Sequence, residues 1–257
     1  YGARYWIVFN GEIYNYRKLR QDLDGNRETA GAKRKAQSAE ELGVHGPRSS
    51  NQTQSTQQTL NASTWNSNSD TEVILSAYAK WGRDCVERLR GMFAFAIWDD
   101  EKQELFLARD SFGIKPLYFY QTSELFLFAS ELRALLASDL VPRKLGQDGL
   151  ASYLQFGSVQ DPLTIIDNVH SLLPGHCLTV RRSGKRIETK ELSFPTPLTP
   201  YALTPNGLRP YPLALSNPPA SQPEAVTQLR HILEDSVRHH MVSDVPVAAF
   251  LSGGIDS

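Results

Sequence analysis

Four short apolar runs between Met92 and Ser130 constrain the fold of this chain more than any other feature. They read MFAFAIWD, ELFLARD, PLYFY and LFLFAS, and turn-forming residues separate them. Short, aromatic-rich runs bounded by turns are typical of β-strands. Downstream, HCLTV and RIETKEL flank RRSGK, which predicts a hairpin. We therefore expect an antiparallel sheet over this part of the chain.

Helical patterns flank these strands in the sequence. In SDTEVILSAYAKWG, Ser69 and Glu72 fit a capping box, apolar residues recur at helical spacing, and Gly82 is a natural stop. ELRALLAS and QDGLASYLQFG also predict helices, and EAVTQLRHILEDSVRHHM has one apolar face. At the start we expect a strand in YWIVF, a turn in NGE and a short helix in YRKLRQDL.

Two segments differ in composition from the rest. Between Asn51 and Ser69, sixteen of nineteen residues are Ser, Thr, Asn or Gln. Such a stretch buries too little apolar surface to offset the entropy lost on ordering. We therefore interpret residues 27–68 as a disordered insertion. From Ser193 to Pro223 there are nine prolines, which predicts a stiff linker poor in regular structure.

The composition narrows the class of protein. With 257 residues, 40% hydrophobic and 21% charged, the chain fits a globular protein of one large domain, or one domain and part of another. The net charge of −1 shows no basic bias that would suggest a nucleic-acid partner, and no apolar run is long enough to span a membrane. Without a secretory signal at its start, we expect a cytoplasmic protein. Cys85 and Cys177 lack metal-ligand spacing and are expected to be buried thiols.

The last eight residues, FLSGGIDS, join an apolar strand to a glycine loop with two serines and an acid. Glycines let the backbone approach an anion closely, and successive N–H groups then point at it. The helix and strand before this loop predict the opening of an α/β domain. Because a helix normally follows a phosphate loop, we expect the chain to be part of a longer protein.

A second candidate site is FNGEIYN. The Asn10 amide and the next backbone N–H can converge on one oxygen, as in an oxyanion hole, and Gly11 allows a substrate close to the backbone. Glu12 could then bind the polar end of that substrate. Asp70 could pair with a substrate ammonium group, although capping a helix would explain it equally well. The residues alone leave these roles open.

Eight blocks occur here in one order and together closely resemble the family of glutamine-hydrolysing asparagine synthetases. They are YWIVFNGEIYNYRKLRQDL, SDTEVILSAYAKWG, LRGMFAFAIWD, LARDSFGIKPLYFY, FASELRALL, YLQFGSV, LLPGHCLTV and FLSGGIDS. Within that family, NGEIYN and GIKPLY are similar to the class II glutamine amidotransferase half. SGGIDS is similar to the ATP-pyrophosphatase half.

The resemblance implies an α+β fold in two parts. The amidotransferase domain, a four-layer α/β/β/α antiparallel sandwich of the Ntn-hydrolase type, would cover residues 1–26 and 69–192. The insertion at 27–68 and the Pro-rich linker at 193–223 would lie outside it. Residues 224–257 would be the truncated start of an α/β ATP-pyrophosphatase domain.

The same resemblance implies an ATP-dependent carbon–nitrogen ligase of asparagine biosynthesis. One site would release ammonia from glutamine. A second would activate the β-carboxylate of aspartate with ATP and Mg²⁺, and ammonia would convert the adenylate to asparagine. Glutamine, aspartate and ATP are therefore the implied partners, and a homodimer is a family expectation.

Site residues follow from the resemblance by position. Asn10 and Gly11 resemble the oxyanion-hole pair, while Glu12 and Asp70 resemble ligands of glutamine, with Asp70 on its α-amino group. The implied ATP site comprises Leu251 as a nucleotide contact and a pyrophosphate loop of Ser252, Gly253, Gly254, Asp256 and Ser257, with Asp256 near the Mg²⁺.

One expected group is missing. Family members begin with a catalytic cysteine whose thiolate attacks glutamine. This chain begins with Tyr1, and neither Cys85 nor Cys177 can have a free α-amino group. We therefore expect an enzyme fragment that is inactive alone. Two alternatives stay open: a relative with another acceptor carboxylate, such as a β-lactam synthetase or a sugar- or peptide-modifying amidotransferase, and a non-catalytic glutaminase-like binding module.

Overall fold

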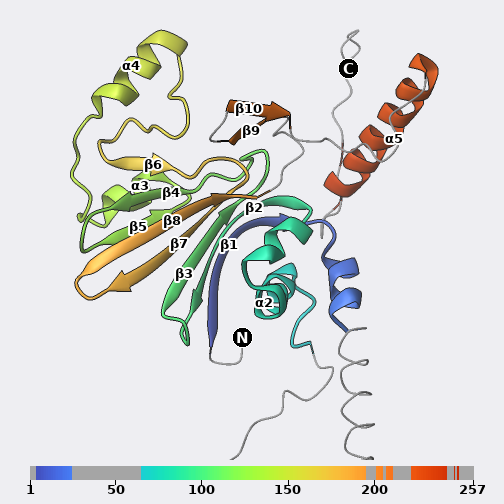
Figure 1. Ribbon diagram of the computed structural model, residues 1–257, viewed down its shortest axis with the longest axis horizontal. Coiled ribbons are helices and arrows are strands. Elements are labelled where there is room, and N and C mark those ends of the chain that lie inside the picture. Colours follow the sequence, from blue (N-terminus) through green and yellow to red (C-terminus); the bar gives the residue numbers. More distant parts are fainter. Residues whose placement is uncertain are drawn as a thin grey trace, which may run out of the picture.

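The computed structural model describes residues 4–24, 65–194, 201–204, 207–210 and 221–241, with residues 246 and 248. Two main sheets and their helices make up this part of the chain, which is α+β as predicted (Figure 1). Neighbouring strands in both sheets pair antiparallel. No helix in these ranges is long and apolar enough to cross a membrane.

The larger sheet has five strands, and β1 and β8 lie at its edges. In order across the sheet they are β1 (Tyr5–Ile13), β2 (Gly91–Asp99), β3 (Glu104–Arg109), β7 (His176–Ser183) and β8 (Arg186–Ser193). A tight turn joins β7 to β8, where Gly184 has φ +62°, a conformation that glycine adopts without strain. The predicted hairpin is confirmed.

The smaller sheet has three strands. In order across it they are β5 (Phe126–Ala129), β4 (Tyr118–Gln121) and β6 (Val169–Ser171). Together, β2, β3, β4 and β5 confirm the four strands predicted from the apolar runs. The three residues of β6 were not predicted, because so short a strand shows no alternation in the sequence.

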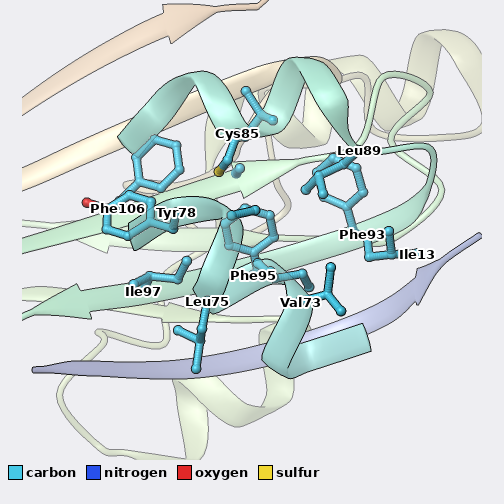
Figure 2. Close-up of a cluster of buried hydrophobic side chains, with 14 of the residues drawn as sticks. Ile13, Val73, Leu75, Tyr78, Cys85, Leu89, Phe93, Phe95, Ile97 and Phe106 are labelled. Atoms are coloured by element: carbon cyan, nitrogen blue, oxygen red, sulfur yellow. The ribbon is translucent and has the colours of Figure 1, made fainter. Parts of the chain in front are cut away.

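One face of the larger sheet packs against α2 (Asp70–Trp81) and the 3₁₀ helix η1 (Gly82–Arg88). Figure 2 shows this closed core, in which side chains from β1, β2 and α2 interlock. The Tyr78 and Phe106 rings stack with their centroids 5.4 Å apart. As predicted, α2 ends at Gly82, whose N–H donates to the Tyr78 carbonyl.

The opposite face of the larger sheet is turned toward the smaller sheet. Here β2 contributes Ala94 and Ala96, which pack with residues such as Leu117 and Leu172. The far face of the smaller sheet packs against α3 (Leu132–Ala137), whose Leu135 is buried. The sheets thus pack together through an apolar layer, and helices cover their outer faces.

The helix α4 (Gln147–Phe156) matches the prediction from QDGLASYLQFG.

Residues 16–24 are helical, as expected, and the chain returns beside them at Trp65. The Trp65 Nε1–H donates to both carboxylate oxygens of Asp24 at 3.0 Å. Asn66 and Ser67 donate backbone N–H groups to the Glu72 carboxylate at 2.9 and 2.8 Å. Residues 65–68 are therefore ordered, contrary to the expected bounds of the insertion. Residues 27–64 of the predicted insertion lie outside the described residues.

The capping box predicted for α2 is not formed in its reciprocal form. Ser69 is the N-cap, but its Oγ accepts from the N–H of Thr71 at 3.1 Å. Glu72 reaches past the N-cap to Asn66 and Ser67 instead. The reason is that the incoming loop presents two free N–H groups to this carboxylate.

The proline-rich region contains more regular structure than predicted. A two-stranded ladder, β9 (Tyr201–Thr204) with β10 (Gly207–Pro210), lies within it. The helix α5 (Gln222–His240) follows, with Ser221 as its N-cap and a proline in its first turn. The expectation of a linker poor in regular structure therefore missed these two strands.

Candidate active site

The structure places Asn10, Gly11 and Glu12 inside β1, not in a turn. These residues pair with Ala94, Phe93 and Met92 of β2, and the ladder continues to Ile13. The turn expected for NGE is therefore wrong. Asn-Gly favours turns locally, but here pairing with a strand about eighty residues away overrides that preference.

Gly11 is required by the close approach of β2. Its φ is +147°, which other residues rarely adopt. A Cβ at this position would lie 2.1 Å from the Met92 carbonyl oxygen and 2.7 Å from the Phe93 Cα. Since both atoms belong to the backbone, a larger residue would displace β2 itself.

The N–H of Gly11 points away from β2. Its partner Phe93 donates its N–H to Asp110 Oδ2 at 3.2 Å, and the Phe93 carbonyl accepts from the Asp110 N–H at 2.8 Å. Opposite residues in an antiparallel ladder exchange both hydrogen bonds or neither. Because Phe93 directs both groups to Asp110, Gly11 must direct its N–H to the outer edge of β1.

Asp70 meets β1 at the same edge. Its Oδ2 accepts the outward-pointing N–H of Ile13 at 3.0 Å, and its Oδ1 lies 3.4 Å from the Ser69 hydroxyl. Asp70 is the first residue of α2, where the helix dipole favours a carboxylate. The fold thus brings this candidate to the strand that carries the other three, although 58 residues separate Asp70 from Glu12.

A cleft of about 350 Å³ opens between the two sheets beside Asn10. Alternation along β1 places Val8 and Asn10 on this side, while Phe9 joins the closed core opposite. The small side chains of Ala94 and Ala96 leave the space open. Most of the cleft wall is apolar, and its polar side chains are those of Asn10 and Ser130.

Neither cysteine fits the role of nucleophile. Cys85 is fully buried, and its burial raises the pKa of the thiol to about 12. Burial also raises the pKa of Cys177. Both thiols therefore stay protonated near neutral pH, whereas a nucleophilic cysteine needs its thiolate. This agrees with the sequence-based rejection of both residues.

Asp110 and Arg109 were not predicted as site residues, but they fix the surroundings of Gly11. Besides Phe93, the buried Asp110 carboxylate accepts backbone N–H groups of Phe112, Ile114 and Lys115, each at 3.0 Å. Arg109 forms an ion pair with Asp161 at 3.0 Å and donates to the Gly113 and Lys115 carbonyls. These interactions hold the loop after β3 against β2.

A second cavity, of about 840 Å³, lies between this region and α5. Arg90 and Asp235 bridge the two parts with an ion pair of 2.8 Å, and the rings of Tyr14 and His240 lie 4.8 Å apart. The Tyr14 hydroxyl is buried with no hydrogen-bond partner among the described residues. Burial, helped by the charges of Glu12 and Asp110, raises the pKa of Tyr14.

The remaining predicted site residues cannot be placed. Leu251, Ser252, Gly253, Gly254, Asp256 and Ser257 lie outside the described residues.

Comparison with known proteins tests the resemblance directly. A family model described as glutamine amidotransferase domain matches residues 51–191, more than half of the chain. The chain belongs to this family. A second family model, asparagine synthase, matches residues 228–257. The order of the two matches along this amidotransferase chain is the order predicted from its motifs.

Individual relatives agree with the family matches. Asparagine synthetase [glutamine-hydrolyzing] 1 of Bacillus subtilis is 34% identical over 98% of the amidotransferase chain and 31% of its own length. Asparagine synthetase [glutamine-hydrolyzing] 3 of the same organism is 31% identical over 100% of the chain and 33% of its own length. The chain therefore spans about a third of the length of these curated relatives.

A solved structure also matches. Glutamine phosphoribosylpyrophosphate amidotransferase from B. subtilis, in complex with ADP and GMP, is 17% identical over 72% of this chain and 28% of its own, with a TM-score of 0.37. A likeness this low carries no conclusion about the fold.

Proposed function

We propose that this chain is the glutamine-hydrolysing part of an ATP-dependent asparagine synthetase. The observation that carries the proposal is the arrangement at residues 10 and 11. Asn10 lines the inter-sheet cleft, and the adjacent Gly11 N–H points to the outer edge of β1. Two donors on neighbouring residues suit the oxyanion that forms when a nucleophile attacks a carboxamide.

Asn10 and Gly11 would act on the γ-carboxamide of glutamine. A cysteine thiolate attacks the carbonyl carbon, and the oxygen gains the negative charge. As the adduct collapses, the proton taken from the thiol passes to the leaving nitrogen, so that ammonia departs and a thioester is left for water to hydrolyse. Each preorganised donor is typically worth about 2.7–4 kcal/mol in such a step. We propose that the cysteine is supplied by a segment that precedes Tyr1 in the natural polypeptide.

Asp70 would bind the α-ammonium group of glutamine, and Glu12 would be a further ligand of the same substrate. Support comes from their placement, since Glu12 follows the oxyanion pair and Asp70 reaches the same edge of β1 through Ile13. The hydrogen bond from Ile13 engages one Asp70 oxygen and orients the other. Asp70 would thus both fix the end of β1 and contact the substrate.

We propose the domain division predicted from the sequence. Residues 1–26 and 69–192 would form a four-layer Ntn-type glutaminase, which the packing of the two sheets between α2 and α3 supports. Residues 27–68 would be an insertion whose last residues are ordered, and 193–223 a linker. Residues 224–257 would begin the synthetase domain, in agreement with the asparagine synthase match.

The synthetase half of the proposal rests on similarity. Leu251 and the loop from Ser252 to Ser257 would bind ATP, with Asp256 near Mg²⁺, and aspartate would be the acceptor. The residues present, a glycine loop with hydroxyls and one carboxylate, suit a nucleotide pyrophosphate and its Mg²⁺. A cytoplasmic location and a homodimer stay predictions.

An isotope experiment on the natural-length polypeptide tests this function. The enzyme is supplied with glutamine labelled with ¹⁵N in the amide, together with aspartate, ATP and Mg²⁺. We expect ¹⁵N-asparagine, with AMP and pyrophosphate formed in equal amounts. Label in free ammonia alone, or in another acceptor, would favour the relative with a different substrate. If the enzyme hydrolyses no glutamine at all, the proposed glutaminase activity is wrong, and the non-catalytic binding module is the remaining alternative.

A further inference from the structure

Ser130 faces Asn10 across the inter-sheet cleft. It lies in FASELRALL, one of the blocks that carry the family resemblance, but was not predicted as a site residue. It follows β5 of the smaller sheet, whereas Asn10 lies on β1 of the larger sheet (Figure 1). Phe126 and Phe128 of β5 face the layer between the sheets. Alternation along the strand continues this side to Ser130, so the two polar side chains approach one space from opposite walls.

The two side chains are the polar groups of an otherwise apolar cleft. Its other walls come from residues such as Val8, Ala96 and Phe128. A mostly apolar cavity with a few convergent polar groups is the usual form of a small-molecule site. Within the described ranges, no hydrogen bond joins the side chain of Asn10 or Ser130 to another residue. Both are therefore available to a ligand.

The chemistry of a carboxamide assigns the two sides of the cleft. A carboxamide has an oxygen that accepts and an NH₂ group that donates. On the proposed function, Asn10 and Gly11 donate to the oxygen. The NH₂ group then needs an acceptor, and the Ser130 hydroxyl oxygen lies on the opposite wall.

We propose that Ser130 is a further substrate-contacting residue, which accepts a hydrogen bond from the NH₂ of the glutamine carboxamide. This inference rests on the proposed glutaminase function and adds a specificity residue to it. The hydroxyl accepts a hydrogen bond from the leaving nitrogen of an amide, whereas toward a γ-ester of the same length it can only donate to the alkoxy oxygen. The acceptor role of Ser130 is therefore specific to the amide.

The test compares two substrates in the natural-length enzyme. Glutamine is hydrolysed to glutamate and ammonia, and the γ-methyl ester of glutamate to glutamate and methanol. The ester has no N–H to donate at this position. For Ser130→Ala we expect kcat/KM to fall about tenfold for glutamine and to change less than about twofold for the ester. Ser130→Thr, which keeps the hydroxyl, should restore most of the activity toward glutamine.

Ser123→Ala is the matched control. Ser123 is the other serine of the β4–β5 hairpin, lies in its turn, and is exposed. We expect it to leave both substrates unchanged, and both variants to melt with the wild type. Equal loss toward both substrates, or no loss toward glutamine, overturns the role of Ser130 while the glutaminase stands. A wild-type enzyme that hydrolyses no glutamine overturns the proposed function and this inference with it.

Discussion

The two faces of β1 and β2 differ in how completely they are packed, although the same strands form both. Toward α2, residues such as Ile13, Phe93 and Phe95 are buried in the closed core of Figure 2. Toward the smaller sheet, β2 lines the cleft with the small side chains of Ala94 and Ala96, and β1 presents Asn10 beside it. On this side Trp6 and Val8 are 52% and 57% exposed.

On the proposed function, this difference separates the folding role of these strands from their chemical role. A strand directs alternate side chains to opposite faces of the sheet. The same strand can therefore fill the core with one set of side chains and line the cleft with the other. Large side chains on the closed face fix the position of the strands. Small and polar side chains on the open face leave room for a substrate. Substitutions on the two faces should therefore have different effects.

The largest expected effect is that of a cavity in the closed face. Phe95 is 1% exposed, so Phe95→Ala should lower the free energy of unfolding by about 3–5 kcal/mol. Val8→Ala, on the open face of the paired strand, should cost less than about 1 kcal/mol, since Val8 is already half in solvent. Denaturant unfolding of both variants measures the contrast. Equal losses would show that the open face is as tightly packed as the closed one.

A Cβ at Gly11 should have the next largest effect. Gly11→Ala combines backbone strain of about 1–3 kcal/mol with a clash against the β2 backbone of about 1–3 kcal/mol. Gly184→Ala is the control, since it also has positive φ but open space around its Cβ. It should cost only about 1–2 kcal/mol. Thermal unfolding measures both variants. Equal melting temperatures would show that β2 shifts to accommodate the new Cβ, and that its close approach does not require a glycine at position 11.

Acid should lower the free energy of unfolding by protonating Asp99, which lies at the end of the β1–β2 pair. Asp99 is fully buried, and its burial opposes ionisation. The hydrogen bonds from Arg4 and from the Lys102 N–H, together with the positive charges of both residues, outweigh burial and hold the pKa of Asp99 below its ordinary value. A lowered folded-state pKa gives stability that is present above the unfolded pKa of about 3.9 and is lost as pH falls through the folded value.

Arg4→Gln tests this assignment. The variant should be less stable than the wild type at pH 7, and the gap should close as the pH falls below about 4. Unfolding free energies at pH 7, 5 and 3 measure it. A gap that is constant with pH would mean that Arg4 acts through packing on Tyr5, whose ring it covers at 4.8 Å, and not through the carboxylate.

The smallest effect is expected from shortening the insertion. The hydrogen bonds between Asp24 and Trp65 close its base. Replacing residues 27–63 by a short Gly-Ser linker should therefore leave thermal unfolding of the domain unchanged. Trp65→Phe, which keeps an aromatic ring but removes the indole N–H, should destabilise by about 1 kcal/mol. A shortened chain that fails to fold would show that both faces of the sheet depend on the insertion.

Much of the fold follows from local patterns. The spacing of apolar residues and the glycine at position 82 predict α2 and its end, and the turn at Gly184 predicts the β7–β8 hairpin. These signals lie within a few residues of the elements they specify. The proposal that Asn10 and Gly11 are oxyanion donors also rests on two adjacent residues, and it stays a prediction.

Features that depend on distant contacts were missed. NGE lies in a strand because Met92, Phe93 and Ala94 pair with it, and no local signal reports that pairing. Arg109 pairs with Asp161 from another loop rather than with a neighbour in sequence. Ser130 comes opposite Asn10 only when the two sheets stack. Such residues are fixed by tertiary packing, which a single sequence does not display.

The most direct test of this account is Asn10→Ala in the natural-length enzyme. Asn10 lies on the open face and bonds to no described side chain, so the free energy of unfolding should stay within about 0.5 kcal/mol of the wild type. Loss of one oxyanion donor should lower kcat for glutamine hydrolysis by about 10²–10³. A variant that hydrolyses glutamine at the wild-type rate, or that loses activity only because it unfolds, would contradict the assignment of chemistry to the open face.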